Sequence, residues 1–532
     1  MDARTETVVD TENGVEVSLV RLHSPLPRDF PEHPDGLEYL HYLRYRSQHG
    51  PKAAAAADAI LVMHPGTWAA AQSLDVLARN VVRRAAVHGR SIEWWSLSRR
   101  SEGASDRTGI DAAYAADDPA IAVDYYFGGK PVGDKVFEGF RRGARLRYLA
   151  ELGMARAVLD QHEVLVRELP DPALRKAKVH IGGHSLGGLL AAAYAGWDLD
   201  GAPGHDQCAG LIAIDTLVSP DPLELVGRGA SRPLGALAGV LHNAVTAGLR
   251  RGLLPRVTPL GPTNVAKFFV LLHILGVAAV CDGTRETTVH HRLPETAGWE
   301  IFLRILGARR YRDLFGDTAS IRRLRLTGEA LFGVVGSDTS MPIDPLQAAM
   351  GSFDGPTVAR TSFPVPRATR RIPGLRTAIR AVFGAPTSVP ADPSVLYGWR
   401  YGGSADLRAL AGLLAGGPLN TFETYFPMRV HYDLWTALAG ARSSDLSGLA
   451  HADGVRSLPT LHALSGPDRF VPQALRLTGL SRPDAFHAPG YGHIDMVIGT
   501  DHPDEPVTAA FTDYLLRHVT PTATPVAGEQ PA

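Results

Sequence analysis

The sequence feature that most constrains the fold is a Gly-His-Ser-Leu-Gly segment at residues 183–187. A short apolar run at 178–182 precedes it, and an alanine-rich helical stretch at 186–195 follows it. A serine on such a strand-to-helix turn takes a strained backbone, and the small flanking residues let neighbouring segments approach closely. We therefore predict that Ser185 is exposed at the carboxyl edge of a sheet, where the helix N-terminus favours developing negative charge. The alternative is a glycine-rich turn that happens to contain a serine.

Segments with strand and helix patterns alternate along the first 216 residues and stop alternating after that point. Apolar runs or alternation predict strands at 15–22, 38–46, 59–63, 92–97, 178–182 and 211–215. Helical spacing predicts helices at 71–87, 137–168 and 186–195. Strands return at 458–465 and 483–487. This order favours an α/β fold with a doubly wound, mostly parallel sheet.

The interruption defines the expected domain boundaries. We predict a core formed by 1–216 and 456–519, a large, mainly helical insertion at 217–455, and a disordered, proline-rich tail at 520–532.

Composition excludes several classes of protein. Lys and Arg total 54 and Asp and Glu total 55, so the net charge of −1 gives no global field for nucleic acid. The two cysteines follow no metal spacing and cannot form a disulfide framework. The acidic first ten residues do not suggest a signal peptide, and the longest apolar run, 268–281, is shorter than the roughly 20 residues of a membrane span. We expect a cytoplasmic protein.

A serine nucleophile needs a base, and the base needs a carboxylate that orients it. His493 ends a Gly-Tyr-Gly-His segment after the last predicted strand. Asp468 follows the strand at 458–465, in a Ser-Gly-Pro-Asp-Arg segment. We predict a catalytic triad of Ser185, Asp468 and His493, with Asp215, which follows the next strand after the nucleophile, as the alternative acid. Either His493 or Asp468 could instead be a structural loop residue.

Acyl transfer also needs two donors for the oxyanion. One is expected to be the backbone N–H of Leu186, and the other the N–H of Thr67 in the His-Pro-Gly-Thr-Trp segment at 64–68, with Gly66 or Trp68 as alternatives. Trp68, His184 and Tyr491 are candidate pocket residues. The segments 93–106 and 124–126 follow predicted strands and either line the same pocket or anchor its loops.

These segments together resemble the serine hydrolases of the α/β-hydrolase superfamily, over about 280 of the 532 residues. The resemblance implies a sheet of about eight strands, a cap inserted after the sixth strand, and the triad of Ser185, Asp468 and His493. Pro65 departs from the more usual His-Gly turn, and the insertion is far larger than the cap of compact esterases. The superfamily includes esterases, lipases, peptidases, lactonases and acyltransferases, so the resemblance alone does not identify a substrate.

The insertion is the best guide to the substrate. Residues 234–254 and 265–281 are apolar helical stretches, and arginines without intervening acids occur at 225–281 and 355–391. Apolar faces bordered by arginine suit a lipid interface or a long acyl substrate, while the alternative is an ordinary packed cap. We expect a small lipophilic ester substrate, possible contact with a membrane or lipid surface through the cap, and neither a metal nor a cofactor.

The leading hypothesis is therefore a serine hydrolase that cleaves a largely apolar carboxylic ester through an acyl-enzyme on Ser185. The alternatives are a peptidase, amidase or acyltransferase with the same triad, or a non-catalytic protein of this fold that binds a ligand.

Overall fold

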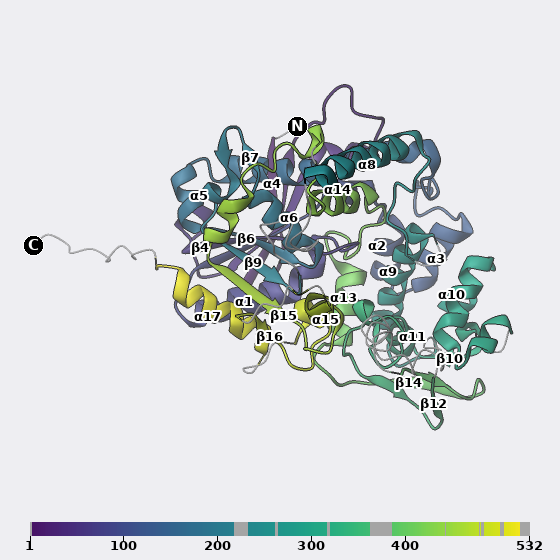
Figure 1. The fold of residues 1–532 in the computed structure, drawn as a ribbon. Coiled ribbons are helices and arrows are strands. Elements are labelled where there is room, and N and C mark those ends of the chain that lie inside the picture. The colour runs from purple at the N-terminus through teal and green to yellow at the C-terminus, as the bar shows by residue number, and fades with distance from the viewer. Residues whose placement is uncertain are drawn as a thin grey trace, which may run out of the picture.

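The computed structural model describes residues 3–216, 232–260, 264–316, 320–361, 386–441, 443–477, 479, 484–500 and 505–521. Its centre is one nine-stranded sheet, with helices on both faces (Figure 1). The strands of this sheet are β1 (Arg4–Glu12), β2 (Val15–His23), β3 (Tyr39–Ser47), β4 (Ala59–His64), β5 (Ile92–Leu97), β6 (Val179–His184), β9 (Gly210–Ile214), β15 (Thr460–Leu464) and β16 (Phe486–His487). The predicted doubly wound, mostly parallel sheet is confirmed.

The strand order is β1-β2-β3-β5-β4-β6-β9-β15-β16. The first three strands are antiparallel neighbours, β3 and β5 are also antiparallel, and all strands from β5 to β16 run parallel. The chain winds outward from β4 to β5 and then crosses back to β6, so the order reverses between β4 and β6. In open α/β sheets, ligands bind at such a reversal, outside the carboxyl ends of the strands.

The two faces of the sheet are buried under different helices, because successive side chains of a strand point to opposite faces. On β4, Leu61 and Met63 join the core beneath α1, while Ile60 and Val62 join the core beneath α4 and α6. The helices of this unit are α1 (Asp75–Val87), α2 (Thr108–Ala115), α3 (Pro119–Gly128), α4 (Met154–Glu168), α5 (Pro172–Lys178), α6 (Leu186–Ala195), α15 (Phe470–Leu477), α16 (Asp495–Ile498) and α17 (Pro506–His518). β4 is buried along its whole length, which explains its uninterrupted apolar sequence.

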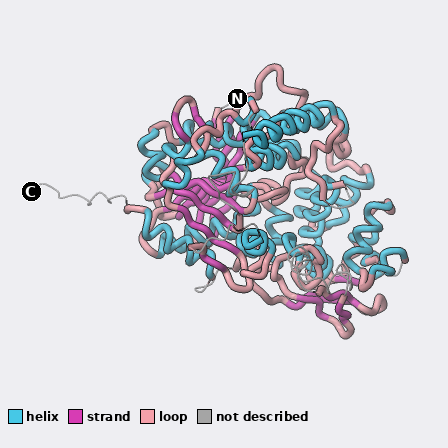
Figure 2. Tube along the Cα trace, in the orientation of Figure 1, coloured by secondary structure: helices cyan, strands magenta, loops and turns pink. Residues whose placement is uncertain are grey.

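The long segment between β9 and β15 builds most of the side of the molecule away from the large sheet (Figure 2). Its helices are α8 (Arg232–Arg251), α9 (Val265–Cys281), α10 (Ala297–Gly307), α11 (Gly328–Gly336), α13 (Leu407–Gly416) and α14 (Met428–Leu438). α9 packs against α11 and α13, and its buried side chains form one core with the sheet. None of the described helices has the length and apolar character needed to cross a bilayer.

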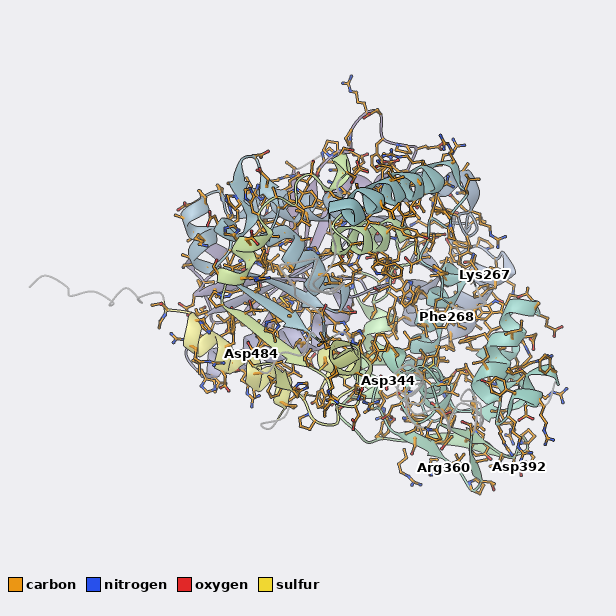
Figure 3. The ribbon with its side chains drawn as sticks, in the orientation of Figure 1. Lys267, Phe268, Asp344, Arg360, Asp392 and Asp484 are labelled. Carbon is orange, nitrogen blue, oxygen red and sulfur yellow. The ribbon has the colours of Figure 1, made fainter. Side chains whose placement is uncertain are left out.

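The same segment also contains short strands that the sequence pattern did not predict. β10 (Arg325–Leu326), β14 (Leu396–Arg400) and β11 (Ser352–Asp354) form one small sheet, and β12 (Val358–Arg360) pairs with β13 (Ser388–Pro390). A further hairpin, β7 (Asp198–Leu199) with β8 (Ala202–Pro203), follows α6. Strands of two to five residues are too short to show a period. Arg360 and Asp392 mark the outer end of this region in Figure 3, and Asp484 lies on the side of the large sheet.

Two further expectations differ from the structure. The helix predicted at 137–168 is a 3-10 segment at Gly143–Ala150 followed by α4, because the backbone N–H of Met154 donates to Asp433 Oδ2 at 2.9 Å and starts a new helix there. β1 was not predicted, since its side chains are almost all exposed and polar. The expected tail beyond residue 521, the arginine-rich part of 362–385 and the beginning of the insertion at 217–231 lie outside the described residues.

Candidate active site

Ser185 occupies a sharp turn between β6 and α6. Its backbone lies at φ 54° and ψ −120°, and its N–H donates to the carbonyl of Ile214 at 2.9 Å. A Cβ on either Gly183 or Gly187 would overlap the carbonyl oxygen of His64, so both glycines are needed for the turn to approach the end of β4. Leu186 is the first residue of α6, where backbone N–H groups have no acceptor within the helix. The strand-to-helix turn and the strained backbone expected for Ser185 are therefore present, and the residue is partly exposed.

His493 lies in the loop after β16 and contacts Asp215. Its Nδ1 atom is 2.7 Å from Asp215 Oδ2, and the second carboxylate oxygen accepts the backbone N–H of Ser465 at 2.8 Å. Asp215 is fully buried, and His493 is nearly so. An imidazole bonded through Nδ1 to a carboxylate keeps Nε2 free to accept a proton.

The structure corrects the expected partner of His493. Asp468 is exposed and makes no side-chain hydrogen bond or ion pair within the part of the chain that the structure describes, whereas the alternative, Asp215, contacts the imidazole. The reason is the path of the chain after β15. The N–H of Gly466 donates to the carbonyl of Tyr491, which turns the backbone toward the neighbouring loop, and Asp468 then lies in a surface turn before α15.

Three residues of this site have a left-handed backbone. In the described chain only six non-glycine residues have positive φ, and these include Ser185 at 54°, Asp215 at 43° and Trp68 at 61°. Such conformations cost about 1–3 kcal/mol each and persist only where the surrounding structure holds them. Their concentration at one edge of the sheet marks it as a site where the fold accepts strain to place side chains.

The carboxyl edge of the sheet opens into a cavity of about 500 Å³. Ser185, His184 and His493 line it from the core, and the insertion supplies most of its other walls. Many of its apolar residues come from α9, α11 and α13 and from the segment before α14: Phe268, Phe269, Leu272, Phe332, Val335, Leu410, Leu414 and Phe422. The loop of His493 and α16 add Ile494, Val497 and Ile498. Figure 3 labels Phe268 on α9. Ligand pockets of this size bury most of the surface of a drug-sized molecule.

The other predicted pocket residues divide into two groups. Thr67, Trp68 and His184 line the cavity. His184 donates through Nε2 to the His493 carbonyl at 3.0 Å, and burial holds the pKa of its imidazole well below the ordinary value. Tyr491, two residues before His493, is buried in the core and is not among the described residues that line the cavity. Residues 93–106 and 124–126 are not among the described residues that line the cavity. Arg99 instead donates to the carbonyls of Pro65 and Gly66, and the Tyr125 hydroxyl donates to Asp106.

Sequence reasoning missed His431, a polar residue in this largely apolar cavity. Its Nε2 lies 3.0 Å from the Thr67 hydroxyl, and its Nδ1 lies 3.2 Å from the Thr258 hydroxyl. Burial lowers the pKa of His431 to about 4, so the imidazole is neutral at pH 7. No sequence motif marks this histidine, because it reaches the site from α14, more than 360 residues after Thr67.

Asp495 ties the His493 loop to the insertion. Its carboxylate accepts the N–H of Gly492 at 2.6 Å and the N–H of Ala349 at 2.7 Å. Burial raises the pKa of this carboxyl group, while the two amide donors oppose that change. Asp495 thus fixes the backbone that carries His493.

The described residues contain no group of three His, Cys, Asp or Glu side chains arranged to hold a metal ion. Ser185, His493 and Asp215 bring a hydroxyl, an imidazole and a carboxylate to this edge of the sheet.

The order of the sheet and the position of the serine decide the fold family. Without β1, the eight remaining strands have the order 1-2-4-3-5-6-7-8 with an antiparallel second strand, the serine turn follows the fifth strand, and the insertion follows the sixth. This chain has the α/β-hydrolase fold. Asp215 also follows the sixth strand of this hydrolase fold, and His493 follows the eighth.

The solved structures that match this chain include proteins described as hydrolases. A Sulfolobus solfataricus protein provisionally described as a lipase is 12% identical, with a TM-score of 0.40, and the match covers 96% of this chain and 99% of that one. A hypothetical protein from Pseudomonas aeruginosa is 14% identical, with a TM-score of 0.31 and coverage of 90% and 95%. The peroxisomal α/β-hydrolase Lpx1 of Saccharomyces cerevisiae is 11% identical, with a TM-score of 0.32 and coverage of 98% and 94%.

No protein-family model matches the sequence of this chain, and no curated protein matches it either. At the identities and TM-scores given above, the structural neighbours assign neither a reaction nor a substrate to it.

Proposed function

We propose that this α/β-hydrolase-fold protein is a serine hydrolase that cleaves a carboxylic ester with a long apolar acyl or alcohol group. One observation carries the proposal: Ser185 on its strained turn and the buried His493–Asp215 pair both meet the same cavity of about 500 Å³. A non-catalytic binding protein would have no need to keep a serine and an oriented imidazole in such costly conformations.

The proposed reaction uses residues of this chain only. Ser185 Oγ attacks the ester carbon while His493 Nε2 takes the hydroxyl proton, and Asp215 holds the imidazole in the tautomer that can accept it. The oxyanion of the tetrahedral intermediate is bound by the N–H groups of Leu186 and Thr67. The proton then passes from His493 to the leaving alcohol, and water activated by His493 releases the acid from Ser185.

The walls of the cavity support an apolar substrate. Aromatic and aliphatic side chains from α9, α11, α13, α15 and α16 line it, and each methylene that they remove from water contributes about 0.8 kcal/mol. Across p-nitrophenyl esters, kcat/KM should therefore rise a few fold per methylene from acetate to at least octanoate. A preference for acetate, or faster cleavage of matched amides, would favour the small-ester or peptidase alternative.

Covalent labelling tests the reaction class directly. A fluorophosphonate should label the wild-type protein, and Ser185→Ala should abolish both labelling and ester hydrolysis. Ser73→Ala provides a matched control, because this buried serine also lines the cavity but donates to the carbonyl of Ala70. An unlabelled wild-type protein would point to a non-catalytic ligand-binding protein.

We further propose that the substrate comes from a lipid surface. The outer face of α8 exposes Leu237, Val240 and Leu241, and its inner face packs on α14 through the His242–Thr436 contact of 2.8 Å. Trp435, next to Thr436, is 62% exposed and also lines the cavity. An apolar helix face beside the cavity mouth favours delivery of a lipophilic ester from a membrane or droplet.

A further inference from the structure

The loop after β4, defined here as the oxyanion loop (residues 65–69), has a conformation that its own sequence does not favour. The N–H of Ala69 donates to the carbonyl of Gly66 at 3.3 Å, which closes a turn with Trp68 in its third position at φ 61°. A positive φ at this position of a turn is normally occupied by glycine or asparagine. The tertiary structure must therefore hold the loop in place.

Arg99 and Glu423 provide that support. The Arg99 guanidinium donates to the Pro65 and Gly66 carbonyls at 3.1 Å each, and also to the carbonyl of Ala69. Its Nε is 2.7 Å from Glu423 Oε1, and the Glu423 N–H donates to the Trp68 carbonyl at 2.7 Å. The carbonyls of residues 65, 66 and 69 therefore face the Arg99 guanidinium, and the carbonyl of Trp68 faces the backbone of Glu423.

The direction of these carbonyls fixes the direction of an amide. In a planar trans peptide, the carbonyl of one residue and the N–H of the next point to opposite sides. Because the Gly66 carbonyl faces Arg99, the Thr67 N–H points away from Arg99. A Cβ built on Gly66 would lie 3.2 Å from Ser185 Cβ, so the loop lies directly against the nucleophile.

We propose that Arg99 and Glu423 are positioning residues that aim the Thr67 N–H at the oxyanion. The inference rests on the proposed function and deepens it, because it makes the insertion part of the catalytic machinery. Glu423 belongs to the insertion, and its carboxylate also accepts the Ser101 hydroxyl at 2.7 Å. The loop after β5 thus links the insertion to the oxyanion loop.

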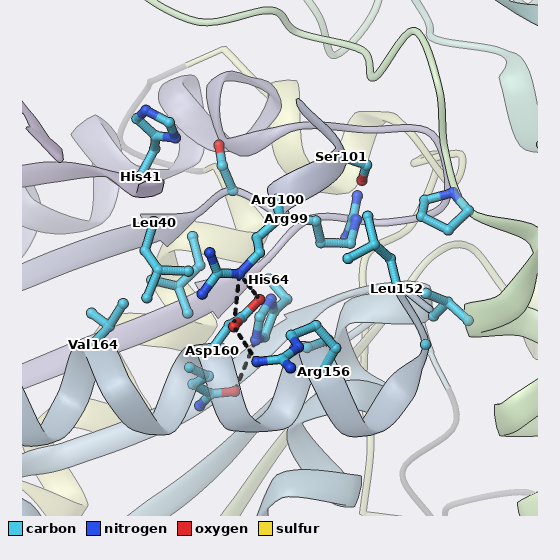
Figure 4. Close-up of a pocket in the computed structure, with 17 residues that line it drawn as sticks. Leu40, His41, His64, Arg99, Arg100, Ser101, Leu152, Arg156, Asp160 and Val164 are labelled. Carbon is cyan, nitrogen blue, oxygen red and sulfur yellow. Dashed lines mark hydrogen bonds and ion pairs between the residues drawn. The ribbon is translucent and has the colours of Figure 1, made fainter. Parts of the chain in front are cut away.

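The test compares two neighbouring buried arginines. Arg99→Lys keeps the positive charge but loses the planar fork that reaches three carbonyls. Arg100→Lys is the matched control: Arg100 is equally buried and bonds to Asp160 and to the carbonyls of Ser24 and Leu37, away from the oxyanion loop. Figure 4 shows both arginines in the region of a small cavity of about 30 Å³, with Arg100 directed at Asp160.

Arg99→Lys should lower kcat for p-nitrophenyl butyrate by about 10- to 100-fold, approaching the loss seen when one oxyanion donor is removed, while KM changes less than threefold. Arg100→Lys should keep kcat within twofold. The matched thionoester gives a readout that folding alone would not move, because sulfur is a weaker hydrogen-bond acceptor than oxygen. Arg99→Lys should therefore lose much less thionoester than ester activity.

Glu423→Gln provides a second variant, since it keeps the backbone N–H to Trp68 and an acceptor for Ser101. Glu423→Gln should also lower kcat for the ester more than kcat for the thionoester. If Arg99→Lys does not fold, this variant alone tests the inference. Equal losses on ester and thionoester, or wild-type kcat in the folded variants, would overturn the inference. A wild-type protein that neither hydrolyses esters nor reacts with fluorophosphonate would instead overturn the proposed function.

Discussion

Replacing Asp215 by asparagine should nearly abolish turnover without changing the shape of the site. The hydrogen bonds of Asp215 determine how the new amide would lie. Oδ1 accepts the Ser465 N–H at 2.8 Å, and only an oxygen can keep that bond. The amide nitrogen is therefore left facing His493 Nδ1, 2.7 Å from the second carboxylate oxygen in the native protein.

This orientation predicts the size of the effect. An amide N–H that donates to Nδ1 leaves His493 with its proton on Nε2, the nitrogen that must accept the proton of Ser185. In the serine-protease example of this change, kcat falls about 10⁴-fold. At 1.36 kcal/mol per tenfold change, the lost stabilisation of the transition state is about 5.4 kcal/mol.

The assay is steady-state hydrolysis of p-nitrophenyl octanoate by Asp215→Asn, with Asp468→Asn as the matched control. Asp468 is exposed, so its variant should retain kcat within about twofold. Circular dichroism and the thermal midpoint would verify that both variants fold. If Asp215→Asn kept more than a tenth of the activity while Asp468→Asn lost most of it, the orientation argument and the assignment of Asp215 would both be wrong.

Three further predictions concern the cavity, the cap surface and pH. Val335→Phe should lower kcat/KM for p-nitrophenyl octanoate by about 15-fold and leave that for the butyrate within twofold, because the larger side chain excludes two methylenes of the acyl chain from the cavity, at a cost of about 1.6 kcal/mol. Val334→Leu is the control, since Val334 is buried but is not among the described lining residues, and it should not change the dependence on chain length. Leu237→Asp combined with Leu241→Asp should reduce cosedimentation with phosphatidylglycerol vesicles while hydrolysis of soluble butyrate stays within twofold; undiminished cosedimentation would exclude α8 as the contact. Burial lowers the pKa of His180 to about 4, below its unfolded value of about 6.5. The folded protein keeps His180 neutral, so the contribution of this residue to stability is complete above pH 6.5 and is lost as the pH falls toward 4. Between pH 7 and 5, the wild-type protein should therefore lose about 2 kcal/mol more of its unfolding free energy than His180→Gln does. Identical pH dependence in both proteins would show that His180 titrates normally.

The sequence alone determined the parts of this protein that depend on local pattern. The apolar run of β4, the limits of β5 and the helix at 265–281 are all as predicted, because burial on both faces or all around an element leaves a mostly apolar sequence. The turn at Ser185 is equally local, since the glycines that permit it lie within two residues of it.

The tertiary structure decided which distant side chains meet. Asp215 and Asp468 both follow strands that end at the same edge of the sheet. The sequence pattern therefore cannot show which of the two carboxylates contacts His493. The choice depends on where each carboxylate lies: Asp215 directly follows β9 and stays at the edge, whereas Asp468 is carried into a surface turn. Arg99 and Glu423 show the same limit, because 324 residues separate them and only the packing of the insertion against the β5 loop brings their charges together.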